Sequence, residues 1–324
     1  MSRISLSVLF LVSLLIISCQ KDPDISIDDQ EVIEIEAYLD SMGVLDQAAV
    51  DTSGIYYYPI TENPTGKSQS SGSVLSFFYS MSLLDGTIID QYDSLDADTL
   101  IVKQGVNAIY PVGFDYSLGY MKEGEKWAFI LPSRVAFGDF SYSTLIPENA
   151  IIKLEIELLQ IQNEEDILDN ELDLIYDYMV YNELDDTVKN PINRPEILPN
   201  GMIYKRLSYG GSARPANDST ITVTYQGRFL DDAVFDRVQN PDYFEFVYGQ
   251  SKTIPGFEIG IGRMAVQERA LIIMPSYLAY KESAQVIPPF LTQNMIDLEI
   301  IPTYASKVGP YKPLIFEIQL IGVN

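Results

Sequence analysis

A repeat about as long as a domain constrains the fold of this chain more than any other feature. Residues Thr222–Asp236 read TVTYQGRFLDDAVFD, and residues Ser76–Asp90 read SFFYSMSLLDGTIID. Tyr79 and Tyr225 are 146 residues apart (225 − 79), and the aspartates that end the two stretches are equally far apart (236 − 90). Solenoid units are about 20–50 residues long, so this period predicts two copies of a whole domain.

The residue inventory excludes several kinds of site. A chain of 324 residues suits two domains of roughly 150 residues each, and 22 Tyr and 14 Phe are enough to build two cores. The formal net charge of −25 argues against a nucleic-acid binder, which needs a basic face to meet phosphates. The chain has no histidine and one cysteine, which excludes zinc sites, histidine-dependent nucleophiles and disulfides within the chain. We therefore expect neither a metal nor a cofactor.

Residues 1–19 have the pattern of a signal peptide. Arg3 is the positive flank, Leu6–Ile17 is the apolar stretch, and Cys19 follows a small residue. The stretch resembles a bacterial lipoprotein signal, which implies cleavage before Cys19 and lipidation of that cysteine; an ordinary secretory signal with an incidental cysteine is the alternative. The resemblance implies a lipid-anchored protein of the cell envelope that does not cross the bilayer. Because Gln20 rather than aspartate follows Cys19, it also implies the outer membrane, on its periplasmic face or at the cell surface.

A predicted helix precedes the β-rich part of each half. The first covers roughly Asp29–Met42 with Asp28 as its cap, and the second covers roughly Glu164–Leu184. Apolar residues recur at helical spacing and are expected to face the cores: Val32, Ile35, Leu39 and Met42 in the first helix, and Leu168, Leu172, Ile175 and Met179 in the second. Residues 163–186 hold ten Asp or Glu and no Lys or Arg, a pattern typical of a solvated surface, with an acidic partner-binding site as the alternative.

Residues 54–161 and 200–324, called the first and second body below, have the pattern of β-rich domains. Each ends on a run that alternates apolar and polar side chains, Ile152–Leu158 and Leu314–Leu320, which predicts an antiparallel sheet with one buried face. A glycine followed by phenylalanine and an acidic residue lies near the middle of each body and predicts one short helix on the sheet.

The predicted fold class is therefore α+β. A tether and helix over 20–53 precede the first body, and an acidic helix and linker over 162–199 precede the second.

Both bodies resemble FKBP-type peptidyl-prolyl cis-trans isomerases, over about 230 of the 324 residues. The motif of the second body is Tyr225-x-Gly227, Phe235-Asp236, Phe244-x-Phe246, Ile254-Pro255-Gly256-Phe257, Met264, Leu278-Ala279-Tyr280 and Leu314-Ile315-Phe316. The first body has a partial version, with Tyr79, Asp85-Gly86, Ile89-Asp90, Pro111-Val112-Gly113-Phe114, Met121, Ala136-Phe137-Gly138, Ile146-Pro147 and Leu154. The tandem layout also resembles lipid-anchored isomerases of the Bacteroidetes, including those associated with gliding motility.

The resemblance implies two FKBP-like domains, each a strongly curved antiparallel sheet wrapped around one short helix, with an aromatic-lined pocket between helix and sheet. It implies catalysis of rotation about X-Pro bonds, which takes tens to hundreds of seconds unaided because the amide barrier is about 18–20 kcal/mol. A dry pocket that strips water from the dipolar amide and holds the proline ring favours the twisted transition state, without covalent chemistry. The implied partners are proline-containing polypeptides, namely secreted or outer-membrane proteins that are folding.

The family's site residues carry over most fully to the second body. The implied catalytic residues are Tyr225, Phe235, Asp236, Phe257 and Tyr280, and the implied substrate-binding residues are Phe244, Ile254, Phe316 and Val308. Phe257 is expected to form the floor under the proline ring, while Asp236 and the Tyr280 hydroxyl hydrogen-bond the substrate backbone. Ile287 and Ile301 are alternatives to Val308. Burying a carboxylate among aromatic side chains is costly unless it has a polar partner, which favours a pocket over a plain core at these residues.

The first body departs further from the family. The resemblance implies substrate contacts at Tyr79, Asp90, Phe114, Phe137 and Ile146. However, Phe137 lacks the hydroxyl of the family's tyrosine, and Pro111 has no N–H for a ligand. Ile89 also replaces the family's phenylalanine. We expect weak or absent isomerase activity in residues 54–161, and a role in binding or spacing.

The loop 281–310 is the main oddity of the second body. Tyr280 and Phe316 are 36 positions apart (316 − 280), against 17 for Phe137 and Leu154 (154 − 137), and Lys281 stands where the family has glycine. The family places this loop over its own pocket, where it influences the choice of client. The loop also keeps alternatives open: a non-catalytic peptide-binding or chaperone module, or an assembly subunit of a surface or motility machine.

Overall fold

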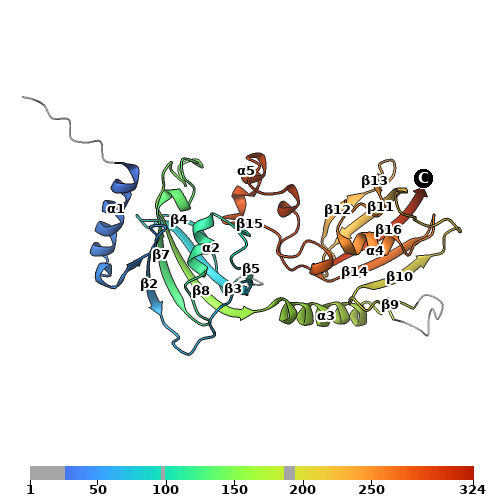
Figure 1. Ribbon diagram of the computed structural model, residues 1–324, viewed down its shortest axis with the longest axis horizontal. Coiled ribbons are helices and arrows are strands. Elements are labelled where there is room, and N and C mark those ends of the chain that lie inside the picture. Colours follow the sequence, from blue (N-terminus) through green and yellow to red (C-terminus); the bar gives the residue numbers. More distant parts are fainter. Residues whose placement is uncertain (1–25, 96–98, 186–193) are drawn as a thin grey trace, which may run out of the picture.

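The computed structural model describes residues 26–95, 99–185 and 194–324, which form two β-rich bodies joined by a helix (Figure 1). The predicted signal peptide, with Cys19, lies outside the described residues. In the part of the chain that the structure describes, no helix is both long and apolar enough to cross a membrane.

The first body is a seven-stranded sheet around a short helix. Its strand order is β1-β2-β7-β8-β3-β4, with β5 also paired to β3, and the described pairs are antiparallel. The strands are β1 (Ala49–Val50), β2 (Tyr56–Thr61), β3 (Val74–Leu83), β4 (Ile88–Tyr92), β5 (Leu100–Lys103), β7 (Lys126–Leu131) and β8 (Ile152–Gln162). Helix α2 (Val112–Leu118) lies on the concave side of the sheet (Figure 1). A 3₁₀ turn, η2 (Ser133–Val135), follows β7.

The second body repeats this plan strand for strand. Its order is β12-β11-β16-β14-β10-β9, with β13 also paired to β11. The strands are β9 (Glu196–Ile197), β10 (Ile203–Ser208), β11 (Thr220–Arg228), β12 (Val234–Val238), β13 (Phe244–Val247), β14 (Arg269–Met274) and β16 (Leu314–Val323). Helix α4 (Pro255–Ile261) and turn η3 (Ser276–Leu278) match α2 and η2. The α+β class, the antiparallel sheets and the short helix of each body are thus confirmed.

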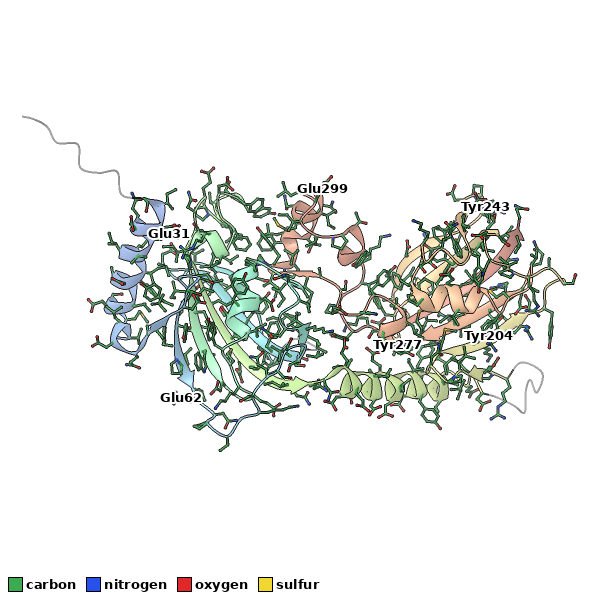
Figure 2. The ribbon with its side chains drawn as sticks, viewed as in Figure 1. Glu31, Glu62, Tyr204, Tyr243, Tyr277 and Glu299 are labelled. Carbon is green, nitrogen blue, oxygen red and sulfur yellow. The ribbon has the colours of Figure 1, made fainter. Side chains whose placement is uncertain are left out.

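The two longer helices begin near their predicted positions but bury different faces. Helix α1 (Ile27–Ser41) is capped by Ser26, not Asp28, and its buried residues are Glu31, Ile35 and Leu39. Val32 and Met42, both predicted to be buried, are 40% and 53% exposed. The turn η1 (Leu45–Gln47) follows. The buried face of α1 is rotated from the predicted one because Glu31 faces the first body (Figure 2) and accepts hydrogen bonds from the turn η2 there.

Helix α3 (Glu164–Tyr181) shows the same rotation. Its buried residues are Ile167, Glu171, Ile175 and Met179, whereas the predicted Leu168 and Leu172 are only half-buried. Asn163 caps the helix and forms a capping box with Asp166. In both helices a buried glutamate occupies a position that an apolar periodicity assigns to the surface.

The loop 281–310 has a structure of its own, and most of it lies on the first body. It contains β15 (Gln285–Val286), η4 (Pro289–Leu291), α5 (Thr292–Asp297) and η5 (Thr303–Ser306). Strand β15 pairs in parallel with β6 (Ile109–Tyr110), directly before α2. Figure 1 shows β15 and α5 beside the first body, far from the rest of the second. The expectation that the whole loop overhangs its own pocket is therefore wrong.

Candidate active site

A cavity of about 560 Å³ lies on the helix side of the second sheet. Seven of the nine residues predicted for this body line it: Tyr225, Asp236, Phe244, Ile254, Phe257, Tyr280 and Phe316. They come from β11, β12, β13, the start of α4, the segment after η3 and β16, so the curvature of one sheet around one helix brings them together. A concave, mostly aromatic cavity with a few polar groups is the usual form of a site for a small ligand or peptide.

The strand register places the walls of the cavity. Gly227 of β11 lies opposite Asp236 of β12 on one side and Phe316 of β16 on the other. A Cβ atom at Gly227 would come within 2.6 Å of the Phe235 ring and 3.0 Å of the Phe316 ring, so glycine is required for these rings to approach. Phe235 packs edge-on against Phe316, with ring centroids 5.7 Å apart, and supports the wall from behind instead of lining the cavity.

Phe257 forms the floor. Its ring is 3% exposed and meets those of Tyr225 and Phe316 at centroid distances of 5.5 and 5.2 Å, with interplanar angles of 79° and 74°. Edge-to-face contacts of this kind fix ring orientation and contribute about 0.5–1.5 kcal/mol each beyond area burial. The floor is consequently rigid before any ligand arrives.

Asp236 contributes a carboxylate to the lining of the cavity. The Tyr225 hydroxyl donates to Oδ2 of Asp236 at 2.7 Å, and Nζ of Lys307 donates to Oδ1 at 3.1 Å. Burial raises the pKa of Asp236, but these hydrogen bonds and the lysine charge outweigh it and hold the pKa below its usual value. Asp236 is therefore ionised at neutral pH, and both of its oxygens are fixed in place.

Tyr280 lies across the cavity from this group. Burial, followed by the negative charge of Asp236, raises the pKa of its hydroxyl, which keeps the proton at neutral pH. Its ring stacks on that of Tyr304, with centroids 5.1 Å apart. The hydroxyl of Tyr280 can thus act as a hydrogen-bond donor to a bound carbonyl group.

The sequence did not point to Tyr304 and Lys307, which belong to the rim of the cavity. Both lie in or next to η5 of the long loop, and the only available signal was the position of that loop between two site residues. Val308, predicted to bind substrate, is 1% exposed in the core of the second body and does not line the cavity. Its rivals Ile287 and Ile301 are buried against the first body.

Lys281 occupies the position where the family has glycine. Its φ is +53°, and Gly138 at the matching place in the first body has a φ of +60°. The turn thus requires the left-handed region, which glycine adopts freely and other residues adopt at a cost. Lys281 also lines the cavity, where a glycine would contribute no side chain.

The first body brings its predicted residues together, but the apolar and aromatic ones among them lie in a closed core. Phe114, Phe137 and Ile146 are buried in one cluster with Ile287 and other apolar residues of the long loop. The Tyr79 hydroxyl donates to Asp90, as Tyr225 does to Asp236 in the second body. The polar pair is therefore present twice, whereas the open cavity described above belongs to the second body.

Comparison with known proteins identifies the family. The sequence model described as FKBP-type peptidyl-prolyl cis-trans isomerase matches residues 66–159 and 211–321, one match in each body. The chain belongs to the FKBP-type peptidyl-prolyl cis-trans isomerases and carries two domains of that family.

Known relatives are distant. The chain is 28% identical to mouse peptidyl-prolyl cis-trans isomerase FKBP10 over 216 residues, which cover 64% of this chain and 30% of the mouse protein. It is 27% identical to the probable FKBP-type isomerase FkpA of Neisseria meningitidis over 124 residues, 38% of each chain. The chain thus spans only about a third of the length of these relatives.

Among solved structures, the three FKBP domains of wheat FKBP73 match 84% of this chain and 96% of the wheat chain, at 18% identity and a TM-score of 0.33. FkpA from Escherichia coli matches 50% of this chain and 64% of its own, at 17% identity and a TM-score of 0.34. The family assignment rests on the match of the sequence model to both bodies.

Proposed function

We propose that the second body is an active peptidyl-prolyl cis-trans isomerase and that the first body contributes little or no turnover. The observation that carries this proposal is the arrangement of Tyr225, Asp236 and Phe257 around one open cavity of about 560 Å³. In the first body, the matching Tyr79 and Phe114 are buried in one core cluster with apolar side chains of the long loop.

The catalytic contribution is differential binding of the twisted amide. The floor at Phe257 holds the proline ring, and the aromatic walls exclude water from the bound peptide bond. A planar amide is more dipolar than a twisted one, so losing water destabilises the ground state more than the transition state. The fixed carboxylate of Asp236 and the Tyr280 hydroxyl, an acceptor and a donor, orient the peptide backbone on either side of the proline.

The matched positions of the two bodies offer a direct test. In a proline-peptide exchange assay on the chain from residue 20 onward, we expect Tyr225→Phe and Asp236→Asn to lower kcat/KM roughly tenfold or more, because each removes a hydrogen bond to or from a charged group. Tyr79→Phe and Asp90→Asn, the same changes in the first body, are expected to leave kcat/KM within about twofold. Unchanged turnover in the first pair, or an equal loss in both pairs, would refute the assignment.

Location and clients form a second part of the proposal. Residues 1–19 support lipidation at Cys19, and with it attachment to the outer membrane and clients among secreted or outer-membrane proteins. We expect a labelled fatty acid to be incorporated by the parent chain in cells and to be lost with Cys19→Ala. Incorporation that persists in this variant would exclude a lipid at Cys19.

A further inference from the structure

A segment of the second body packs against the apolar residues predicted for the site of the first. Residues 284–301, called the docked segment below, bury Val286, Ile287, Leu291 and Met295 to 4% exposure or less. These side chains join the core cluster that contains Phe114 of the first body together with the other apolar residues predicted for that site. Ile301 joins the same cluster at 9% exposure.

The main chain of the docked segment is held as a bound peptide would be. The Gln285 N–H donates to the Ala108 carbonyl at 2.7 Å, and the Ile287 N–H donates to the Tyr110 carbonyl at 2.9 Å. The side-chain amide of Gln285 adds a bond of 2.7 Å to the Ile101 carbonyl. Pro111, next to this pairing, has no N–H, so this edge of the first body offers carbonyl acceptors to its ligand.

Side chains at the mouth of the site continue the contact. The Phe290 ring lies 5.0 Å from that of Tyr142, centroid to centroid. The docked segment continues through α5, and Glu299, just after this helix, lies at the upper end of the loop in Figure 2, on the side of the first body that faces the second. The segment runs Ala-Gln-Val-Ile-Pro-Pro-Phe-Leu from residue 284, and is apolar and rich in proline.

We propose that the first body is a peptide-binding site whose ligand is this segment of the same chain, and that the docked segment closes the site to other polypeptides. The site selects an apolar, proline-containing strand that supplies two N–H donors, one to the Ala108 carbonyl just before β6 and one to the Tyr110 carbonyl in β6. The tether gives the segment a high effective concentration, so a free peptide of the same chemistry competes poorly while the segment is docked.

Releasing the segment tests the docking. Leu291→Ser combined with Met295→Ser removes two buried anchors, and Leu298→Ser makes the same kind of change at a position that is 55% exposed on the same segment. We expect amide hydrogen exchange at Gln285 and Ile287 to become at least tenfold faster in the double variant and to stay at the parent rate with Leu298→Ser. Trp127, the only tryptophan, lies in β7 and reports by its emission that the first body remains folded. If the double variant unfolds this body, the single change Leu291→Ala takes its place.

Binding of a probe tests occlusion. A fluorescein-labelled peptide of residues 283–302 is expected to bind the double variant at least tenfold more tightly than the parent, measured by anisotropy. Parent and double variant both carry Phe257→Leu in this measurement, which removes the proline floor of the second body so that the first body's site is compared. Equal binding to the two proteins, or binding to neither, would overturn the proposal.

Discussion

Two buried glutamates hold the 3₁₀ turns η2 and η3 in place by hydrogen bonds. Glu31 of α1 accepts hydrogen bonds from the Ser133 N–H at 2.9 Å and from its hydroxyl, and Glu171 of α3 accepts one from the Ser276 N–H at 2.7 Å. These serines begin η2 and η3, which end two residues before Phe137 and Tyr280. The helix before each body therefore caps the turn that positions a predicted site residue.

The pH dependence of stability at Glu171 follows from this burial. Desolvation raises the pKa of Glu171 above its ordinary value of 4.5, against the opposing hydrogen bonds from Ser276, and its Oε1 is buried with no hydrogen-bond partner among the described residues. A raised pKa in the folded state means that the folded protein binds the proton more tightly than the unfolded chain. The contribution of Glu171 to the free energy of unfolding is therefore largest below pH 4.5 and is lost as pH rises through the folded pKa.

We predict that Glu171→Gln removes this dependence. The free energy of unfolding of the parent minus that of the variant should become more positive as pH falls from 7 toward 4.5, as measured by urea unfolding at several pH values. Glu165→Gln, the same change at an exposed position of this helix, is measured over the same pH range as the matched control. A constant or falling difference for Glu171→Gln would contradict the prediction.

At the scale of elements, α3 belongs to the second body. It buries Ile175 and Met179 against Ile203, Leu271 and other apolar residues on the outer face of the second sheet. At its start, Glu164 pairs with Lys103 of the first body at 2.9 Å, a contact exposed enough to contribute little. The free energy that docks α3 thus comes from its apolar stripe.

Two neighbouring residues of α3, one in the apolar stripe and one on the exposed face, allow the contribution of the stripe to be tested. We predict that Ile175→Ala, at 2% exposure, lowers the free energy of unfolding by about 2–5 kcal/mol, because it loses transfer free energy and leaves a cavity. Leu174→Ala, at 54% exposure, should change it by less than about 0.5 kcal/mol. Denaturant unfolding measures both, and equal losses would show that α3 is not docked by this face.

Local pattern predicted most elements, and non-local contacts account for the failures. The alternation of apolar and polar residues in Leu314–Leu320 predicted β16, and the glycine before Phe257 predicted α4. Both signals are local, because they depend only on residues within the element itself. The buried face of α1 was predicted wrongly because Glu31 accepts a hydrogen bond from Ser133, which is more than 100 residues away in the sequence (133 − 31). The strand residues that line the cavity were predicted from the resemblance to the family motif.

The loop could not be placed in the same way. Nothing in an apolar run such as residues 286–291 tells which of two similar bodies will bury it. As a result Val308 was assigned to the cavity, while Tyr304 and Lys307 were missed.

At the scale of the molecule, the loop links the closed site of one body to the open cavity of the other. Its first part is the docked segment on the first body, and its last part carries Tyr304 and Lys307 over the second cavity. The base of the loop is closed on the second body, where the Tyr311 N–H donates to the Lys281 carbonyl at 2.8 Å and Ser283 donates to the Val308 carbonyl at 2.9 Å. The rim of the cavity is therefore held from both ends.

Undocking should weaken catalysis in the second body if that body is the isomerase. The stack of Tyr304 on Tyr280 has a contribution of about 0.5–1.5 kcal/mol, so its loss corresponds to roughly two- to tenfold in kcat/KM. We predict a loss of that size, mainly in KM, for Leu291→Ser with Met295→Ser, and none for Leu298→Ser. Tyr304→Ala should cause a similar loss by itself. Because both changes act through the contact of Tyr304 with Tyr280, combining them should lower kcat/KM no further than either change alone. Additive losses in this double-mutant cycle would show that docking of the segment and the rim contact are independent.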